Sequence, residues 1–109
     1  MKIKEVCEDY IEFDNGNIIS VRDSSQIYSY ADNYADFKQL EELAFDVDFN
    51  ENLTFEKCEY GFRFGNTPVN MFFIPCYSKQ NGYYSSKIDV EYCDKVVISQ
   101  VECDILLPY

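Results

Sequence analysis

Histidine and tryptophan are absent from this 109-residue chain, and basic residues are scarce. Without histidine, the chain lacks the imidazole that most often acts as general base for a serine or cysteine nucleophile. The cysteines never form a Cys-x-x-Cys pair, which argues against a zinc site. We therefore expect no enzyme, no metal and no cofactor, and we expect reduced, half-buried thiols at Cys7, Cys58, Cys76, Cys93 and Cys103.

Long apolar segments are also missing. No run approaches the ~20 apolar residues that a membrane-spanning helix needs, and residues 1–5 lack the apolar stretch of a signal peptide. The chain nevertheless contains 47% hydrophobic residues, with ten tyrosines and nine phenylalanines. This composition predicts one folded, soluble, intracellular domain over residues 1–109.

The clearest local pattern is a β-hairpin. Residues 10–13 and 18–21 are rich in strand-forming residues and flank Asn15-Gly16, a pair that suits a two-residue turn with positive φ at both positions. In that register Phe13 pairs with Ile18, and neither face of the hairpin is cleanly apolar. An earlier strand is expected over residues 2–7.

A helical pattern follows. Phe37, Leu40 and Ala44 fall at i, i+3 and i+7, which predicts a short amphipathic helix. Asn33 is a suitable N-cap for it, and Asp36 would favour the positive helix end.

The C-terminal half alternates again between apolar and polar residues. We expect strands at 62–64 and 69–74, with Pro75 ending or interrupting the second, and a hairpin around Asn81-Gly82. Two further strands are predicted at 88–92 and 97–105. The predicted fold class is α+β, with one curved antiparallel sheet of several short hairpins and a single short amphipathic helix packed on it.

The formal charge of −11 is unevenly distributed along the chain. Residues 1–40 carry −4, residues 41–59 carry −6 and residues 60–109 carry −1. Such a surface repels nucleic acid and attracts basic proteins, and spaced carboxylates can imitate a phosphate backbone. An acidic loop that only maintains solubility is the alternative. We predict a partner-binding surface formed by the acids of the middle segment: Glu41, Glu42, Asp46, Asp48, Glu51, Glu56 and Glu59.

Part of this segment resembles a calcium-binding loop. Residues 46–51 begin with the alternating Asp-x-Asp-x-Asn pattern of an EF-hand. Position six, however, is Glu51 instead of glycine, and position twelve is Lys57 instead of glutamate. The sequence therefore predicts no specific calcium site.

A second candidate site groups aromatic, hydroxyl and basic side chains that could stack on a base and hydrogen-bond a phosphate. Cross-strand packing at a hairpin tip is the structural alternative. The candidate ligand-binding residues are Arg63, Tyr83, Tyr84, Ser85, Ser86 and Lys87.

Three short motifs, residues 33–37 (NYADF), 61–64 (GFRF) and 81–86 (NGYYSS), resemble a family of small acidic proteins of unassigned function encoded by bacteriophages and prophages. That family carries an acidic, cysteine-bearing stretch before the first motif, where this chain has residues 27–30 (IYSY). Size and charge also resemble phage-encoded anti-CRISPR proteins, which block a positively charged guide or target channel.

These resemblances imply a phage counter-defence protein in the cytoplasm of a bacterial host cell. The expected activity is non-enzymatic inhibition of a basic, nucleic-acid-handling host protein, with a Cas9-type effector as one candidate. A sponge for a nucleotide-derived immune signal and a phage accessory protein without inhibitory role are the alternatives. Monomer and homodimer remain equally open.

Overall fold

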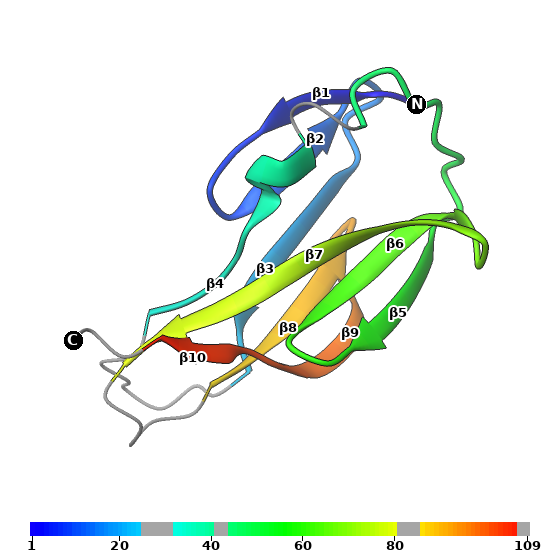
Figure 1. Cartoon of the computed structure of the whole chain (residues 1–109). Coiled ribbons are helices and arrows are strands. Elements are labelled where there is room, and N and C mark those ends of the chain that lie inside the picture. The colour runs from blue at the N-terminus through cyan, green and yellow to red at the C-terminus, as the bar shows by residue number, and fades with distance from the viewer. Residues whose placement is uncertain (25–31, 41–43, 81–85, 107–109) are drawn as a thin grey trace.

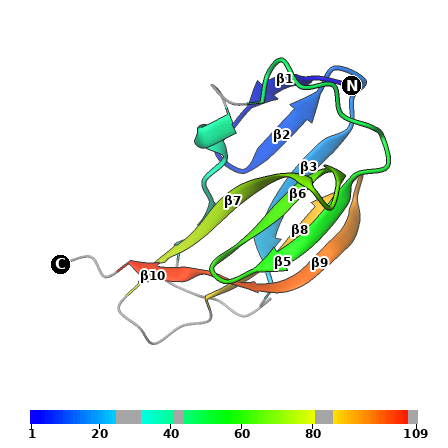
Figure 2. The same cartoon turned by 45° about the vertical axis from the view of Figure 1, so that its right-hand side comes forward.

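Two five-stranded sheets pack against each other in the computed structural model, which describes residues 1–24, 32–40, 44–80 and 86–106 (Figures 1 and 2). The first sheet has the order β1 (Ile3–Val6), β2 (Tyr10–Phe13), β3 (Ile18–Asp23), β8 (Lys87–Tyr92) and β9 (Lys95–Glu102). The second has the order β10 (Asp104–Leu106), β7 (Asn70–Lys79), β6 (Gly61–Thr67) and β5 (Thr54–Cys58), with β4 (Asp32–Ala35) also paired to β7.

The core lies between the sheets. Along β2 and the first part of β8, every second residue points inward, as the period of two requires. Ile11, Ile19 and Val90 of the first sheet and Phe62 and Phe64 of the second are fully buried. All strand pairs are antiparallel except β7 with β10, which run parallel.

The predicted α+β class is wrong, because the described residues form an all-β fold of two sheets. Where the helix was expected to begin, Asp32–Ala35 is strand β4, and Phe37–Gln39 form a 3₁₀ turn, η1. Residues 41–43 of the expected helix lie outside the described residues. The N-cap of η1 is Asp36 and not Asn33. The Asp36 carboxylate accepts a hydrogen bond from the Lys38 amide at 3.2 Å. The predicted apolar positions Phe37, Leu40 and Ala44 are indeed buried. Pairing of residues 32–35 with β7 extends the chain through the predicted N-cap Asn33, so the helix does not begin there.

The first hairpin is confirmed, but its predicted register is wrong by one residue. Glu12 pairs with Ile18 and Ile11 pairs with Ile19, and only Gly16 of the expected turn has positive φ. This register places both isoleucines of the Ile11–Ile19 pair in the core. The two-residue turn with positive φ at both positions occurs instead at Cys93-Asp94, between β8 and β9.

Pro75 does not end its strand, which continues to Lys79, but it interrupts the pairing, the other predicted outcome. It lies where β7 changes partners: Gly61 of β6 pairs with Pro75, and Ala35 of β4 pairs with Cys76, the next residue. A proline lacks the amide hydrogen that a continuous ladder of hydrogen bonds needs. The junction between two pairing partners is therefore a position where β7 tolerates a proline.

Of the predicted hairpin between residues 76–78 and 83–87, only the ends are described: residues 77 and 78 pair with β4 and β10, and Lys87 belongs to β8 of the first sheet. Residues 81–85 lie outside the described residues. The strands predicted at 88–92 and 97–105 are present as β8, β9 and β10. A bulge at Gln100, with φ of 56°, shifts the alternation, so that Ile98 is buried and Val97 is exposed.

Phe49 connects the two sheets. Its ring packs edge-on against Phe13 of the first sheet, with 5.6 Å between the ring centroids. It also contacts Phe64 and Phe72 of the second sheet, at centroid distances of 5.6 and 5.7 Å. Only 2% of its surface is exposed. The segment leading into β5 is therefore anchored between the sheets by this one side chain.

We predict that Phe49→Ala lowers the free energy of unfolding by about 3–5 kcal/mol, because it removes a buried ring and leaves a cavity. Phe73→Ala is the matched control, since the Phe73 ring is 46% exposed, and it should cost much less. Urea denaturation of the two variants measures the difference. Equal losses would show that Phe49 does not have this anchoring role.

Candidate functional site

Two acidic segments that are far apart in the sequence lie together at one end of the molecule. Strands β1 and β2 and the segment leading from residue 44 toward β5 occupy the top of Figures 1 and 2, next to the N-terminus. We call residues 1–14 and 44–51 together the acidic end. It contains one part of the predicted acidic surface and a second part that the sequence prediction did not include.

Backbone and side-chain bonds fix this arrangement. The Phe49 amide donates to the Met1 carbonyl oxygen at 2.6 Å, and the Met1 amine donates to the Asp48 carboxylate at 2.9 Å. The Asn15 side-chain amide donates to Glu51 at 3.5 Å. The amine lowers the pKa of the Asp48 carboxyl, first through its hydrogen bond and then through its charge.

The side chains of the acidic end carry more than half of the net charge. Eight acids less two lysines give −6, compared with −11 for the whole chain. The lysines are Lys2 and Lys4. The acids are Glu5, Glu8, Asp9, Glu12, Asp14, Asp46, Asp48 and Glu51.

Two of these acids lie directly opposite each other. Glu5 of β1 pairs with Glu12 of β2, and within the described part of the chain neither forms an ion pair. Like charges opposite each other on neighbouring strands are destabilising. Beside them, a hydrogen bond with Cys7 and then the charges of Cys7 and Glu5 raise the pKa of the Tyr10 hydroxyl to about 12.

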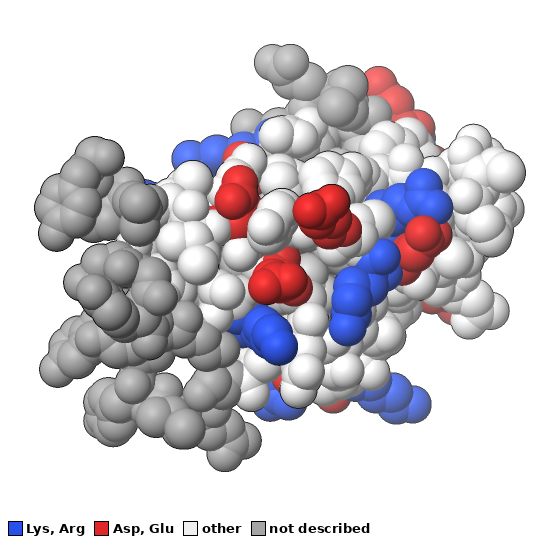
Figure 3. All heavy atoms as spheres, turned by 60° about the horizontal axis from the view of Figure 1, so that its bottom comes forward, with Lys and Arg blue, Asp and Glu red and all other residues white. Residues whose placement is uncertain are grey.

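The remaining predicted acids lie elsewhere. Glu56 is on β5, where its carboxylate forms an ion pair with Arg63 at 2.6 Å, and exposed Glu59 follows in the turn before β6. Glu41 and Glu42 lie outside the described residues. On the face at the bottom of Figure 1, acidic and basic side chains are interspersed (Figure 3). The predicted surface is thus divided, and the part around Asp46, Asp48 and Glu51 joins the acidic end.

The described members of the second predicted set are not brought together on one sheet. Arg63 lies on β6 of the second sheet and is bound by Glu56, which raises the pKa of the guanidinium by hydrogen bonding and charge. Lys87 begins β8 of the first sheet, and Ser86 precedes it. Tyr83, Tyr84 and Ser85 lie outside the described residues.

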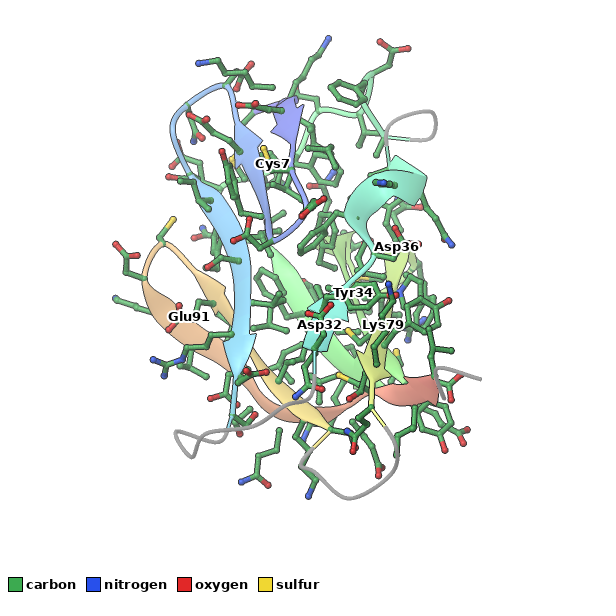
Figure 4. All side chains as sticks on the ribbon, turned by 90° about the vertical axis from the view of Figure 1, so that its left-hand side faces the viewer. Cys7, Asp32, Tyr34, Asp36, Lys79 and Glu91 are labelled. Carbon is green, nitrogen blue, oxygen red and sulfur yellow. The ribbon has the colours of Figure 1, made fainter. Side chains whose placement is uncertain are left out.

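A hollow of about 370 Å³ lies between the β1–β2 turn and strand β4. Figure 4 shows Cys7 on one side and Asp32, Tyr34, Asp36 and Lys79 on the other. Asp32, Tyr34 and Asp36 are alternate residues of an extended segment, so their side chains lie on one face of it. Glu8 and Lys38 complete the charged lining.

Tyr34 is the aromatic centre of this hollow. Its ring lies 5.8 Å from that of Tyr77, and the Lys79 ammonium lies 5.5 Å from its centroid. Burial, and then the charges of Asp36 and Asp32, raise the pKa of its hydroxyl. At neutral pH the hydroxyl therefore stays protonated and can donate a hydrogen bond.

The sequence prediction did not include the residues of the hollow. The alternation of Asp32, Tyr34 and Asp36 is a strand signal, but the helical spacing that begins at Phe37 overlaps it. Nothing in the sequence placed Cys7 and Glu8 beside that segment.

All five cysteines are free thiols. A hydrogen bond with Cys103, and then burial, raise the pKa of the Cys76 thiol, so this inner pair behaves as small hydrophobic side chains. Among the described residues there is no group of three or more cysteine, aspartate or glutamate side chains suited to a metal ion. In the described part of the chain, no helix is long and apolar enough to cross a membrane.

Comparisons with protein-family models, with curated proteins and with solved structures gave no significant match.

We predict that Cys7→Ala lowers the pKa of Tyr10 from about 12 toward that of an ordinary tyrosine, because the Cys7 hydrogen bond is the largest cause of the shift. NMR titration of ¹³Cζ-labelled tyrosine measures it. Cys58→Ala, which alters a half-buried thiol on β5, is the control and should leave Tyr10 unchanged. An unchanged Tyr10 titration in Cys7→Ala would contradict the assigned cause.

Proposed function

We propose that this chain is a phage or mobile-element counter-defence protein that acts without catalysis, by binding a basic, nucleic-acid-handling host protein through its acidic end. The observation that supports this proposal most directly is the Glu5–Glu12 pair, in which two carboxylates are held opposite each other on a sheet without an ion pair among the described residues. A basic partner relieves that repulsion on binding.

The rigidity of the acidic end favours this function. Strands β1 and β2 and the Phe49 anchor fix the backbone that carries its carboxylates. Charges held in place need not be ordered on association, so less free energy is lost than for a flexible acidic tail. Long-range attraction between opposite charges also accelerates the encounter.

The partner class follows from the charge. A surface with a side-chain charge of −6 competes with the phosphate backbone for lysines and arginines. A Cas9-type effector is one candidate, because it holds its guide–target duplex in a positively charged channel. Occupation of that channel would obstruct binding of guide or target.

We predict that the triple variant Glu5→Lys, Glu12→Lys, Asp46→Lys strongly weakens binding. Each replacement of an acid by lysine raises the net charge by two, so the three together change it from −11 to −5. If each reversal costs about 1 kcal/mol at the interface, affinity falls by roughly a hundredfold. Titration of the purified partner at low and high salt measures the loss.

The matched control is Glu59→Lys, Asp94→Lys, Glu102→Lys. It makes the same change in net charge at three exposed positions outside the acidic end and should retain most of the affinity. The partner is first obtained by pull-down from lysates of defence-competent bacteria with the wild-type chain and both variants. Equal loss in the two variants, or retention of no basic protein, would contradict the proposal.

A further inference from the structure

An asparagine followed directly by a glycine lies in the turn between β2 and β3. Asn15 and Gly16 are both exposed to solvent, and a Cβ atom added at Gly16 would meet nothing within 4 Å. Because glycine has no side chain to obstruct the approach, its backbone nitrogen can reach the side-chain carbon of the preceding asparagine. The pair is therefore a reactive site as well as a turn.

Hydrogen bonding activates the side-chain amide of Asn15. The backbone amide of Asn17 donates to Asn15 Oδ1 at 3.1 Å. A donor at this position draws electrons from Cγ and stabilises the negative charge that the oxygen acquires when a nucleophile adds to that carbon. On the other side of the amide, Nδ2 lies 3.5 Å from Glu51 Oε1. Asn15 Cγ is thus an exposed and polarised electrophile.

The closed turn restrains the nucleophile. The Gly16 amide donates to the Phe13 carbonyl oxygen at 3.0 Å, and this bond must open before the nitrogen can lose its proton and attack. The turn lies beyond the last β2–β3 pair, Glu12–Ile18, and exposed turns open at a much lower free energy than the whole domain. The turn therefore slows the reaction relative to an unfolded chain without preventing it.

We propose that Asn15 is a site of spontaneous deamidation in the folded protein. The Gly16 amide gives its proton to solvent, and its nitrogen forms a bond to Asn15 Cγ. The bond between Cγ and Nδ2 breaks, and Nδ2 takes a proton from solvent and leaves as ammonia. Water then opens the cyclic imide at either of its carbonyl carbons, so that aspartate or isoaspartate remains at position 15. The reaction consumes only water.

The product changes the contact between the β2–β3 turn and the acidic end. A carboxylate at position 15 cannot donate to Glu51, and the two negative charges repel each other. The net charge changes by one, from −11 to −12. We therefore expect the deamidated chain to be less stable than the original. This site does not depend on the function proposed above.

The test is incubation of the folded chain at neutral and at mildly alkaline pH, followed by peptide mass spectrometry that locates each event. Asn15 should deamidate at least about tenfold faster than the other asparagines of the described residues. The rate should rise with pH, because the attacking nitrogen must be deprotonated. The other asparagines all precede a residue with a side chain: Asn17, Asn33, Asn50, Asn52, Asn66 and Asn70. Asn81 lies outside the described residues and is mapped separately.

Two variants and one peptide provide the controls. Asn15→Gln should lack one of the acidic species that ion-exchange chromatography separates from the aged wild-type chain. Asn15→Asp carries the charge of the product and should unfold at a lower temperature than the wild type at low salt, with a smaller difference at high salt. A synthetic peptide of residues 10–21 should deamidate faster than the folded chain, because its turn is not held closed.

The proposal is overturned if residue 15 of the folded chain stays intact while the peptide deamidates completely, since the turn would then prevent the reaction. It is also overturned if another asparagine of the described residues reacts first. An Asn15→Asp chain as stable as the wild type at low salt would overturn the expected loss of stability.

Discussion

The position of Phe49 between the two sheets is the constraint on which the functional surfaces of this protein depend. Its ring contacts Phe13 of one sheet and Phe64 and Phe72 of the other, while its backbone amide bonds to Met1. A chain of this size buries a modest core, and the Phe49 ring contributes contacts to both of its sheets. The same anchor brings residues 44–51 alongside β1 and β2.

The electrostatics of the acidic end follow from that placement. Two segments of moderate charge combine into one surface, and the Glu5–Glu12 pair adds a local repulsion that the sheet must tolerate. Net stability of a small domain is only a few kcal/mol, so such repulsion is a cost that binding of a cationic partner would remove. Arg63 illustrates the opposite case, because Glu56 already neutralises it.

Strand β7 organises the other side of the molecule. It pairs with β6 up to Pro75 and with β4 and β10 beyond it. The change of partner at a proline directs β4 to the edge that faces the β1–β2 turn, and the hollow forms there. Asp32 and Lys79 thus meet across a β4–β7 pair, with Tyr34 beside them.

The sequence by itself determined where most strands lie and several residues of the core. The apolar positions Phe37, Leu40 and Ala44 are buried, and the first hairpin and β8 lie where the alternation of side chains predicts them. The sequence also determined the net acidity of the chain. Only the tertiary structure decided that residues 32–35 are a strand, because the hydrogen-bonding partner of this segment is β7, which is distant in the sequence. Only the tertiary structure, likewise, combined residues 1–14 with 44–51 and placed Cys7 opposite Tyr34, since contacts between distant segments leave no periodic trace in the sequence.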